Sequence, residues 1–563
     1  MYGLKKENMP NPENPEVDKP KQGQKDQTQN KLVSTESCSG DQNRIKSKKV
    51  QSLLRSTGLV GVMTLLSRVF GLIRDVVVAH LFGASTGADA FFIAFKIPNF
   101  FRRLFAEGAF SQAFIPILSE YRSTKTEKDV RQLANSVSGV LGSILFVITM
   151  LAMLGAPWMT ALFAPGFLED AAKFNLASDM LRITFPYLLL ISMTAFAGSI
   201  LNSYGYFAIP AFTPVLLNLV LISAAIWLTP YFSQPIVGLA WGVLIAGGLQ
   251  LFFQLPFLLK MGLLPRPRLD YQHEGVRRIF KLMLPALFGV SVSQINLLLD
   301  TVLASFLQTG SVSWLYYSDR LAELPLGIFG IAIATVVLPT LSRKHASQSS
   351  KAFSDTLDWA LRIILLMGLP AGLALIVLAE PLVTTLFYYG EMTQHDVFMS
   401  ALSLRAYASG LLAFMLIKVL APGYFSRQDM KTPVKVGIWA MCANMVLNLI
   451  LIGPLHHTGL ALATAISSWM NAFWLLRGLV KEKVYHRRHG WGLFIARIVF
   501  ANVVLISLIY WLQVPIQQWF DYNALERCLA LGQLVAIGIA AYFLALILSG
   551  LKLKKMLSGS INE

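Results

Sequence analysis

The sequence predicts an all-α polytopic membrane protein with about fourteen transmembrane helices. Two six-helix repeats, an N-lobe and a C-lobe, surround a central cavity, and two extra C-terminal helices follow. Composition is the first indication, because 55% of the 563 residues are hydrophobic, 14% are charged and the mean hydropathy is +0.56. Apolar runs of about 20 residues, the length that spans the hydrocarbon core, recur along the chain. An internal repeat is the third indication.

Fourteen segments have the length and hydropathy of membrane spans. In chain order they cover 59–81, 88–120, 134–156, 178–203, 213–229, 236–260, 279–307, 312–342, 358–379, 397–425, 434–453, 458–479, 491–512 and 528–550. Residues 1–50, before the first span, are rich in Lys, Gln, Asn, Pro, Asp and Glu and lack apolar periodicity. This composition predicts a disordered cytoplasmic tail, without the apolar segment of a cleaved signal peptide.

The distribution of Lys and Arg predicts the orientation. The acidic connections are those at 157–178 and 380–396, and they alternate with basic connections at 122–131, 260–281, 343–362, 427–435 and 477–488. Basic connections stay in the cytoplasm, so both termini are expected there. The formal net charge of +17 follows from this topology and does not indicate a nucleic-acid partner.

Short segments recur in the same order in the two halves of the chain. FIPILS at 114–119 corresponds to VLPTLS at 337–342, and VLLNLVLI at 215–222 corresponds to MVLNLILI at 445–452. Each repeat holds six spans, an even number, so the halves share one orientation, as in transporters with a site between two lobes. The predicted parts are a tail (1–50), an N-lobe with helices 1–6 (51–262), a C-lobe with helices 7–12 (263–485) and helices 13–14 (486–563).

Charged side chains gather in the first two spans, although a charge at membrane depth costs about 2.5–3.5 kcal/mol on insertion scales. Asp89, Lys96 and Arg103 recur every seven residues and therefore share one face of the second helix with Glu107. Arg320 in the eighth span is expected to meet the first lobe across the cavity. The predicted polar chamber comprises Arg68, Arg74, Asp75, Asp89, Lys96, Arg102, Arg103, Glu107 and Arg320.

A surplus of guanidinium groups suits a pyrophosphate, because their planar forks bind phosphate oxygens in pairs while carboxylates pair the unoccupied arginines. The alternative is structural ion pairing that locks two helices together, and it stays open for Asp75 and Glu107. For Arg74, Arg103 and Arg320 the favoured interpretation is ligand contact, because a structural network needs no excess of positive charge.

Other classes of protein fit the sequence less well. The chain has no Gly-rich nucleotide loop, catalytic triad or His-rich metal motif, and its three cysteines lack metal-ligand spacing, which predicts no enzyme and no resident cofactor. A membrane-embedded glycosyltransferase would need acidic residues in large outward loops, and these loops are short. A channel would show a ring of charge. Because one chain completes the cavity, a monomer is expected.

Four long motifs carry a family resemblance: SRVFGLIRD at 67–75, ADAFFIAFKIPNFFRRLFAEGAFSQAFIPILSEY at 88–121, GSVSWLYYSDRL at 310–321 and KVLAPGYFSRQDMKTPVK at 418–435. They resemble the MurJ (MviN) family of lipid II flippases, in the multidrug/oligosaccharidyl-lipid/polysaccharide exporter superfamily. The resemblance runs from about residue 50 to the end of the chain. Only the N-terminal tail lies outside it.

The resemblance implies export of lipid II, the undecaprenyl-pyrophosphate-linked peptidoglycan precursor, from the inner to the outer leaflet of the bacterial cytoplasmic (inner) membrane for cell wall synthesis. It also implies that Arg68, Arg74, Arg103 and Arg320 line the cationic cavity, with Asp75 and Asp89 in the same network. The two extra helices would form a groove for the lipid tail. A flippase for another polyprenyl-pyrophosphate-linked oligosaccharide is the alternative. An exporter of cationic drugs would need an acidic chamber.

The energy source is a separate question. Asp300 in the seventh span, Asn444 and Asn448 in the eleventh and Thr464 in the twelfth offer oxygen ligands for a hard cation. Some family members have a sodium site at matching positions. An asparagine stands at 448, where a carboxylate would strengthen the site. Sodium, a proton and the membrane potential therefore remain alternative driving forces.

Overall fold

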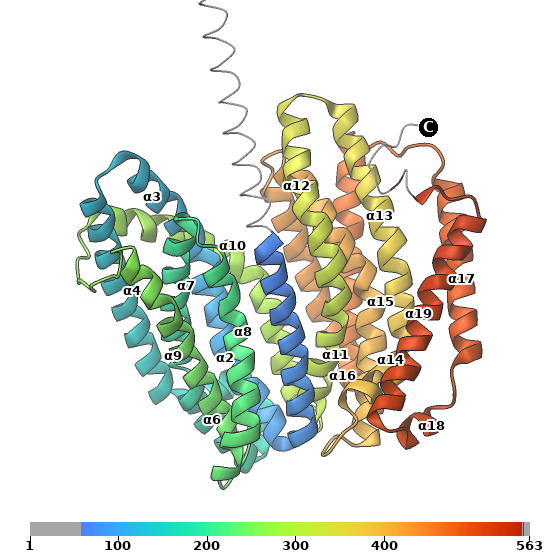
Figure 1. Ribbon diagram of the computed structural model, residues 1–563, viewed down its shortest axis with the longest axis horizontal. Coiled ribbons are helices and arrows are strands. Elements are labelled where there is room, and N and C mark those ends of the chain that lie inside the picture. The colour runs from blue at the N-terminus through green and yellow to red at the C-terminus, as the bar shows by residue number, and fades with distance from the viewer. Residues whose placement is uncertain (1–57, 554–555, 557–563) are drawn as a thin grey trace, which may run out of the picture. The chain divides into compact units, whose positions relative to one another are not determined.

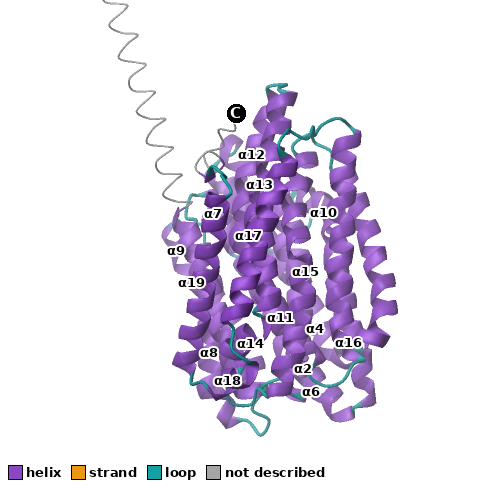
Figure 2. Cartoon of the chain, turned by 90° about the vertical axis from the view of Figure 1, so that its right-hand side faces the viewer, coloured by secondary structure: helices purple, strands orange, loops and turns teal. Residues whose placement is uncertain are grey.

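The computed structural model describes residues 58–553 and 556, apart from the side chains at 105–107, 286, 288–293, 297 and 331. The tail predicted over residues 1–50 lies outside the described residues, and so does the Glu107 side chain. The chain from Met63 onward forms one compact unit. Every element of secondary structure in the described residues is helical, as Figure 2 shows.

The first repeat opens with a helix over residues 58–82. It continues with α2 (Thr86–Arg102), the π-helix η1 (Arg103–Phe110), α3 (Ser111–Thr124), α4 (Glu127–Leu154), α5 (Ala156–Phe163), η2 (Pro165–Glu169), α6 (Ala171–Thr184), α7 (Tyr187–Ser203), α8 (Ala208–Ser223), η3 (Ala224–Leu228), η4 (Thr229–Tyr231) and α9 (Val237–Lys260).

The second repeat and the C-terminal helices follow the same pattern. They comprise α10 (Glu274–Ser305), α11 (Ser311–Pro325), the π-helix η5 (Leu326–Gly330), α12 (Ile331–Ala346), α13 (Ser350–Val377), α14 (Ala379–Phe387), α15 (Gln394–Phe425), α16 (Lys431–Lys481), α17 (Trp491–Leu512), α18 (Ile516–Asp521) and α19 (Ala524–Leu548).

The predicted spans coincide with long helices, and the differences have local causes. The eleventh and twelfth spans form one element, α16, with a sharp kink at His456, where φ is 48°. The span predicted at 178–203 is interrupted before α7, because Pro186 precedes that helix. The short helices α5, α14 and α18 escaped prediction, since no periodic pattern is visible over so few residues. By length and composition, ten helices in the described part could cross a membrane, so the count of fourteen stays a prediction.

The helix boundaries repeat at a spacing of 223 residues. Helices α4 and α13 both begin and end 223 residues apart, and so do the starts of the two π-helices at Arg103 and Leu326. A proline precedes each π-helix: Pro98 lies inside α2 and Pro325 ends α11. Proline removes a backbone N–H from the helical ladder, which favours such irregular turns. Both repeats therefore carry the same break within their second span.

Two hydrophobic cores hold the helices together. One surrounds the first repeat and reaches α15 and α16, and the other joins the second repeat to the C-terminal helices. There α17 packs against α19 and α13, while α19 also contacts α14, and Figure 1 shows α17 and α19 together on the outer side of the second repeat. In a membrane, where lipid is as apolar as a side chain, such helix pairs associate through close packing.

The packing of α15 against α16 gives a stability prediction. A Cβ atom on Gly410 would lie 2.7 Å from the Cα atom of Ala465 in α16, so the two helices must separate to accept it. We expect Gly410→Ala to lower the free energy of unfolding by about 1–3 kcal/mol, measured as a lower melting temperature in detergent micelles. Gly532→Ala is the control, because nothing lies within 4 Å of its Cβ position. Equal melting temperatures for the two variants would contradict the tight packing.

Candidate functional site

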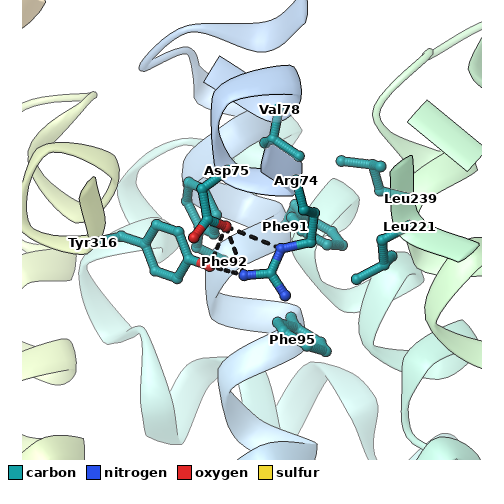
Figure 3. Close-up of a pocket in the computed structure, with 9 residues that line it drawn as sticks. All are labelled: Arg74, Asp75, Val78, Phe91, Phe92, Phe95, Leu221, Leu239 and Tyr316. Carbon is teal, nitrogen blue, oxygen red and sulfur yellow. Dashed lines mark hydrogen bonds and ion pairs between the residues drawn. The ribbon is translucent and has the colours of Figure 1, made fainter. Parts of the chain in front are cut away.

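A buried carboxylate lies at the centre of the predicted polar chamber. Arg74 and Asp75 follow each other on the helix over 58–82 and are 5% and 2% exposed. The Arg74 guanidinium donates to Asp75 Oδ1 from Nε (2.9 Å) and Nη2 (2.6 Å), and its Nη1 donates to Asn218 Oδ1 of α8 (3.1 Å). Figure 3 shows this pair beside the phenol of Tyr316. Arg74 is thus held on two sides within the first repeat.

The second repeat reaches the same carboxylate from α11. Tyr316 accepts from Arg74 Nη2 (2.8 Å) and donates to Asp75 Oδ1 (2.9 Å), while Arg320 Nε donates to Asp75 Oδ2 (3.0 Å). Arg320 also donates to Glu323 Oε2 (3.4 Å), and its side chain stays 36% exposed. Asp75 therefore accepts four hydrogen bonds, two of them from the other repeat. Hydrogen bonds to a charged group are roughly twice as strong as neutral ones.

The space beside this cluster is small. A cavity of about 10 Å³, lined by Arg74, Asp75, Tyr316 and apolar side chains of α2, α8 and α9, holds one water molecule at most. The Phe92 ring stacks on Tyr316 with centroids 4.0 Å apart. In this conformation the Arg74–Asp75 pair is closed off, and Arg320 is the member of the cluster that a ligand reaches.

Four further cations of the predicted chamber lie in the C-terminal half of α2, at the start of η1 and on the first helix. Lys96 and Arg103 are exposed, Arg68 is half-buried, and none of these three forms a hydrogen bond or ion pair with another described residue. The Arg68 guanidinium lies against the backbone of Gly327 in η5 of the second repeat. Arg102 is held by Asn99, to whose Oδ1 its Nε donates (3.1 Å). Three cations are therefore available to an anionic ligand.

Asp89 lies apart from this cluster. Its carboxylate is 1% exposed and accepts from Lys173 Nζ (2.9 Å). It also accepts from the backbone N–H groups of Gly310 (2.8 Å) and Ser313 (3.0 Å) and from the Ser313 hydroxyl (2.7 Å). These groups form the N-terminus of α11, where an anion is favoured by the free N–H groups and the helix dipole. The structure thus places Asp89 as a cap between repeats, outside the network that the resemblance implied.

The candidate cation ligands meet between α10 and α16. Asn448 Nδ2 donates to Asp300 Oδ1 (2.7 Å) and to Asn444 Oδ1 (3.0 Å), and the Thr464 hydroxyl donates to Asp300 Oδ2 (3.3 Å). Asn448 is fully buried, and its Oδ1 atom has no hydrogen-bond partner among the described residues. All four sequence-predicted residues are therefore in one cluster, within the second repeat and apart from Asp75.

Three residues of these sites were missed by the sequence analysis: Tyr316, Asn218 and Lys173. A tyrosine in an apolar span gives no periodic signal, and Lys173 lies in a connection that otherwise looks acidic. Asn218 did leave a signal, because it interrupts the run VLLNLVLI, and Asn448 holds the same place in the matching segment MVLNLILI. Each asparagine contacts a charged residue on the opening helix of its own repeat.

Two helical repeats joined through a buried carboxylate and bordered by available cations define a two-lobe membrane transporter. A family model for lipid II flippase MurJ matches residues 78–530. The chain belongs to the MurJ family.

Relatives and solved structures agree with this assignment. A probable lipid II flippase MurJ of Vibrio cholerae serotype O1 is 51% identical over 511 residues, covering 90% of this chain and 97% of its own. The lipid II flippase MurJ of Burkholderia cenocepacia is 40% identical, covering 89% of this chain and 98% of its own. A solved structure of a lipid II flippase MurJ in an inward closed conformation aligns with a TM-score of 0.74 at 28% identity, covering 86% of this chain and 97% of that chain. An inward-facing MATE transporter, at 15% identity and a TM-score of 0.62, covers 76% of this chain and 98% of that chain and shares the fold.

Removal of the Asp89 charge is expected to destabilise the protein. Asp89→Asn leaves the buried Lys173 ammonium without its counter-ion, which costs about 3–5 kcal/mol and lowers the melting temperature in detergent. Asp179→Asn is the control, because its ion pair with Arg182 is exposed and worth about 0–1 kcal/mol. If both variants melt at the wild-type temperature, Asp89 does not hold the repeats together.

Proposed function

We propose that this protein is a flippase that moves lipid II from the inner to the outer leaflet of the bacterial cytoplasmic membrane by alternating access. The observation that carries the proposal is the cationic cluster shared by both repeats, in which Arg74 and Arg320 bind the two oxygens of one carboxylate. Membership in the MurJ family supports the same substrate. In this proposal both termini are cytoplasmic, the protein works as a monomer without enzymatic activity, and residues 486–563 hold the lipid tail.

A pyrophosphate is the part of lipid II that suits the cluster. Its oxygens bind guanidinium forks in pairs, so Arg320 and the available cations Arg68, Lys96 and Arg103 together offer more donors than one carboxylate can use. When pyrophosphate oxygens replace Asp75 as the partner of Arg320, the ion pair between the repeats breaks. Binding of the substrate and loss of the ion pair that joins the two lobes then occur together.

The contacts between repeats support an alternating-access mechanism. Several of them lie at the end of the molecule that carries the acidic connections, which we assign to the periplasm. There the Glu391 N–H donates to the His80 carbonyl (3.0 Å), the Tyr317 hydroxyl donates to the Gly83 carbonyl (2.9 Å), and Asp89 caps α11. At the opposite, basic end the Arg278–Glu120 ion pair joins α10 to α3, so substrate entry from the cytoplasm requires that pair to open while the periplasmic contacts hold. Export then requires that these contacts open.

A flippase for another polyprenyl-pyrophosphate-linked oligosaccharide remains the alternative, because the pyrophosphate is common to both substrates. Cells depleted of the protein separate the two proposals. Loss of periplasm-facing lipid II, restored by wild type and not by Arg320→Ala, supports lipid II as the substrate. Unchanged lipid II exposure favours the other lipid.

The arginine cluster yields a binding prediction. Arg320→Ala removes a charge-assisted hydrogen-bond donor group that the ligand reaches, a loss of about 1.5–3 kcal/mol, and Arg74→Ala leaves Asp75 to hold Arg320 more tightly, so lipid II binding should weaken roughly 10- to 100-fold in both variants. Flipping in proteoliposomes should fall accordingly while the variants still insert. Arg343→Ala, which removes an exposed cation from the end of α12, is the charge-matched control and should behave as wild type. Normal flipping by both cluster variants would overturn the proposal.

A cation at the Asp300 cluster is the proposed coupling ion. One carboxylate and three neutral oxygen-bearing side chains, Asn444, Asn448 and Thr464, suit a monovalent ion such as sodium. The unpartnered Oδ1 atom of Asn448 supports the fit, and rotation of the two amides would turn their oxygens toward Asp300. Bound sodium would couple flipping to its inward gradient, whereas the membrane potential acts on charge at about 2.3 kcal/mol per 100 mV without a bound ion.

Sodium dependence is measured by replacing sodium with choline on both sides of proteoliposomes. We expect flipping to fall at least several-fold in choline, and Asp300→Asn to reduce flipping in sodium to the same level. Lipid II binding should weaken far less in Asp300→Asn than in Arg320→Ala, because Asp300 forms no ion pair with the arginine cluster and acts only on the charge of Lys96. Undiminished flipping in choline would reject sodium coupling and favour the membrane potential or a proton.

A further inference from the structure

The second repeat contains a cavity of its own, separate from the cationic cluster. It has a volume of about 370 Å³ and lies between α10, α15 and both halves of α16. None of the predicted chamber residues lines it. Polar side chains form one wall, and small or apolar residues form the rest: Asn296, Ser467, Ser468 and Asn471 face Ile417, Ala421, Phe425, Pro433, Val434, Gly437, Ala440, Met441 and Leu475. This cavity is named the C-lobe vestibule.

Helical spacing connects the vestibule to the Asp300 cluster at three places. Asn296 precedes Asp300 by four residues on α10, and Ser468 follows Thr464 by four residues on α16. Met441 precedes Asn444 by three residues in the first half of α16. Residues three or four apart lie on one face of a helix, about one turn of 5.4 Å from each other. The same three helix faces therefore build both the cluster and the vestibule.

A hydrogen bond joins the C-lobe vestibule to the Asp300 cluster. Ser467 lines the vestibule, and its hydroxyl accepts from Asn444 Nδ2 of the cluster at 3.5 Å. Asn444 in turn accepts from Asn448, which donates to Asp300. The cluster thus borders the vestibule directly, with no apolar layer between Ser467 and Asn444.

Unsatisfied oxygens mark the path. The Oδ1 atoms of Asn296 and Asn471 in the vestibule and of Asn448 in the cluster are buried, and none has a hydrogen-bond partner among the described residues. A buried polar atom without a partner costs about 1–3 kcal/mol, so such atoms are normally paired with water or an ion. Carbonyl-type oxygens are also the ligands that hard cations prefer. Three of them in sequence suit a cation that exchanges its hydration shell step by step.

We propose that the C-lobe vestibule is the path by which a small monovalent cation reaches and leaves the Asp300 cluster. The inference rests on the cation coupling proposed above. The vestibule begins at Phe425, the last residue of α15, and Pro433 in the first turn of α16, which flank a basic connection assigned to the cytoplasm. The ion and the lipid then use different routes. A cation can therefore exchange with the cytoplasm while lipid II occupies the arginine cluster.

Cysteine accessibility tests the path independently of transport. In the full chain with Cys38, Cys442 and Cys528 replaced by serine, Ser468→Cys or Asn471→Cys is exposed to a membrane-impermeant cationic thiol reagent on inside-out vesicles. We expect labelling of both positions, slowed at least several-fold by sodium relative to choline, and loss of this protection in Asp300→Asn. Ser403→Cys in α15 is the matched control, since Ser403 is fully buried outside the vestibule and should not react.

Lipid II binding distinguishes the possible failures. No labelling at either position, or labelling that sodium does not change, overturns the vestibule as an ion path. A bulky Ser468→Leu should reduce sodium-dependent flipping severalfold while lipid II still binds as in wild type. If Ser468→Leu flips lipid II at the wild-type rate, the path is also rejected. Failure of the wild-type protein to bind lipid II would instead reject the proposed substrate and leave the labelling result standing.

Discussion

The carboxylate of Asp75 joins the two repeats, and the positions of Arg74, Tyr316 and Arg320 depend on it. It accepts from Arg74 on its own helix and from Tyr316 and Arg320 on α11. At 2% exposure an unpaired carboxylate would be expensive, so the ion pairs must form together or be replaced together. A ligand that binds one of the arginines therefore weakens the whole set of ion pairs at Asp75. Recognition of an anionic ligand and loss of the ion pair between the repeats then both result from the exchange of partners at the arginines.

A second buried carboxylate acts differently because its partners are different. Asp89 binds a lysine and the N-terminus of a helix, and its backbone partners are part of the fold itself. Three of its four donors belong to the other repeat, so separation of the repeats at this end would expose them to water. An anionic ligand can thus replace Asp75 as the partner of Arg320. When the contacts of Asp89 open, only water can replace it.

The fold was predictable from sequence to a degree set by the strength of each pattern. Long apolar spans such as α17 coincide with the predicted 491–512, since hydropathy over twenty residues leaves little ambiguity. The π-helices were not predictable, because η1 follows charged residues on a face whose spacing of seven indicated a regular helix. For the site, the charged residues were found by their cost in a membrane, but their partners were not. Pairing depends on which helices meet, and only the packed repeats decide whether Asp89 faces Arg74 or Lys173.

The matching asparagines have a consequence for how the two halves diverged. Asn218 presents its oxygen to the Arg74 guanidinium, and Asn448 presents its nitrogen to the Asp300 carboxylate. A carboxamide carries a donor nitrogen and an acceptor oxygen on the same carbon. Rotation of the amide by 180° therefore lets it face either a cation or an anion. A half-molecule with an asparagine at this place could be duplicated, and one copy could then face an arginine while the other faces a carboxylate. The two lobes can therefore carry opposite charges beside the asparagine with no difference at the asparagine itself.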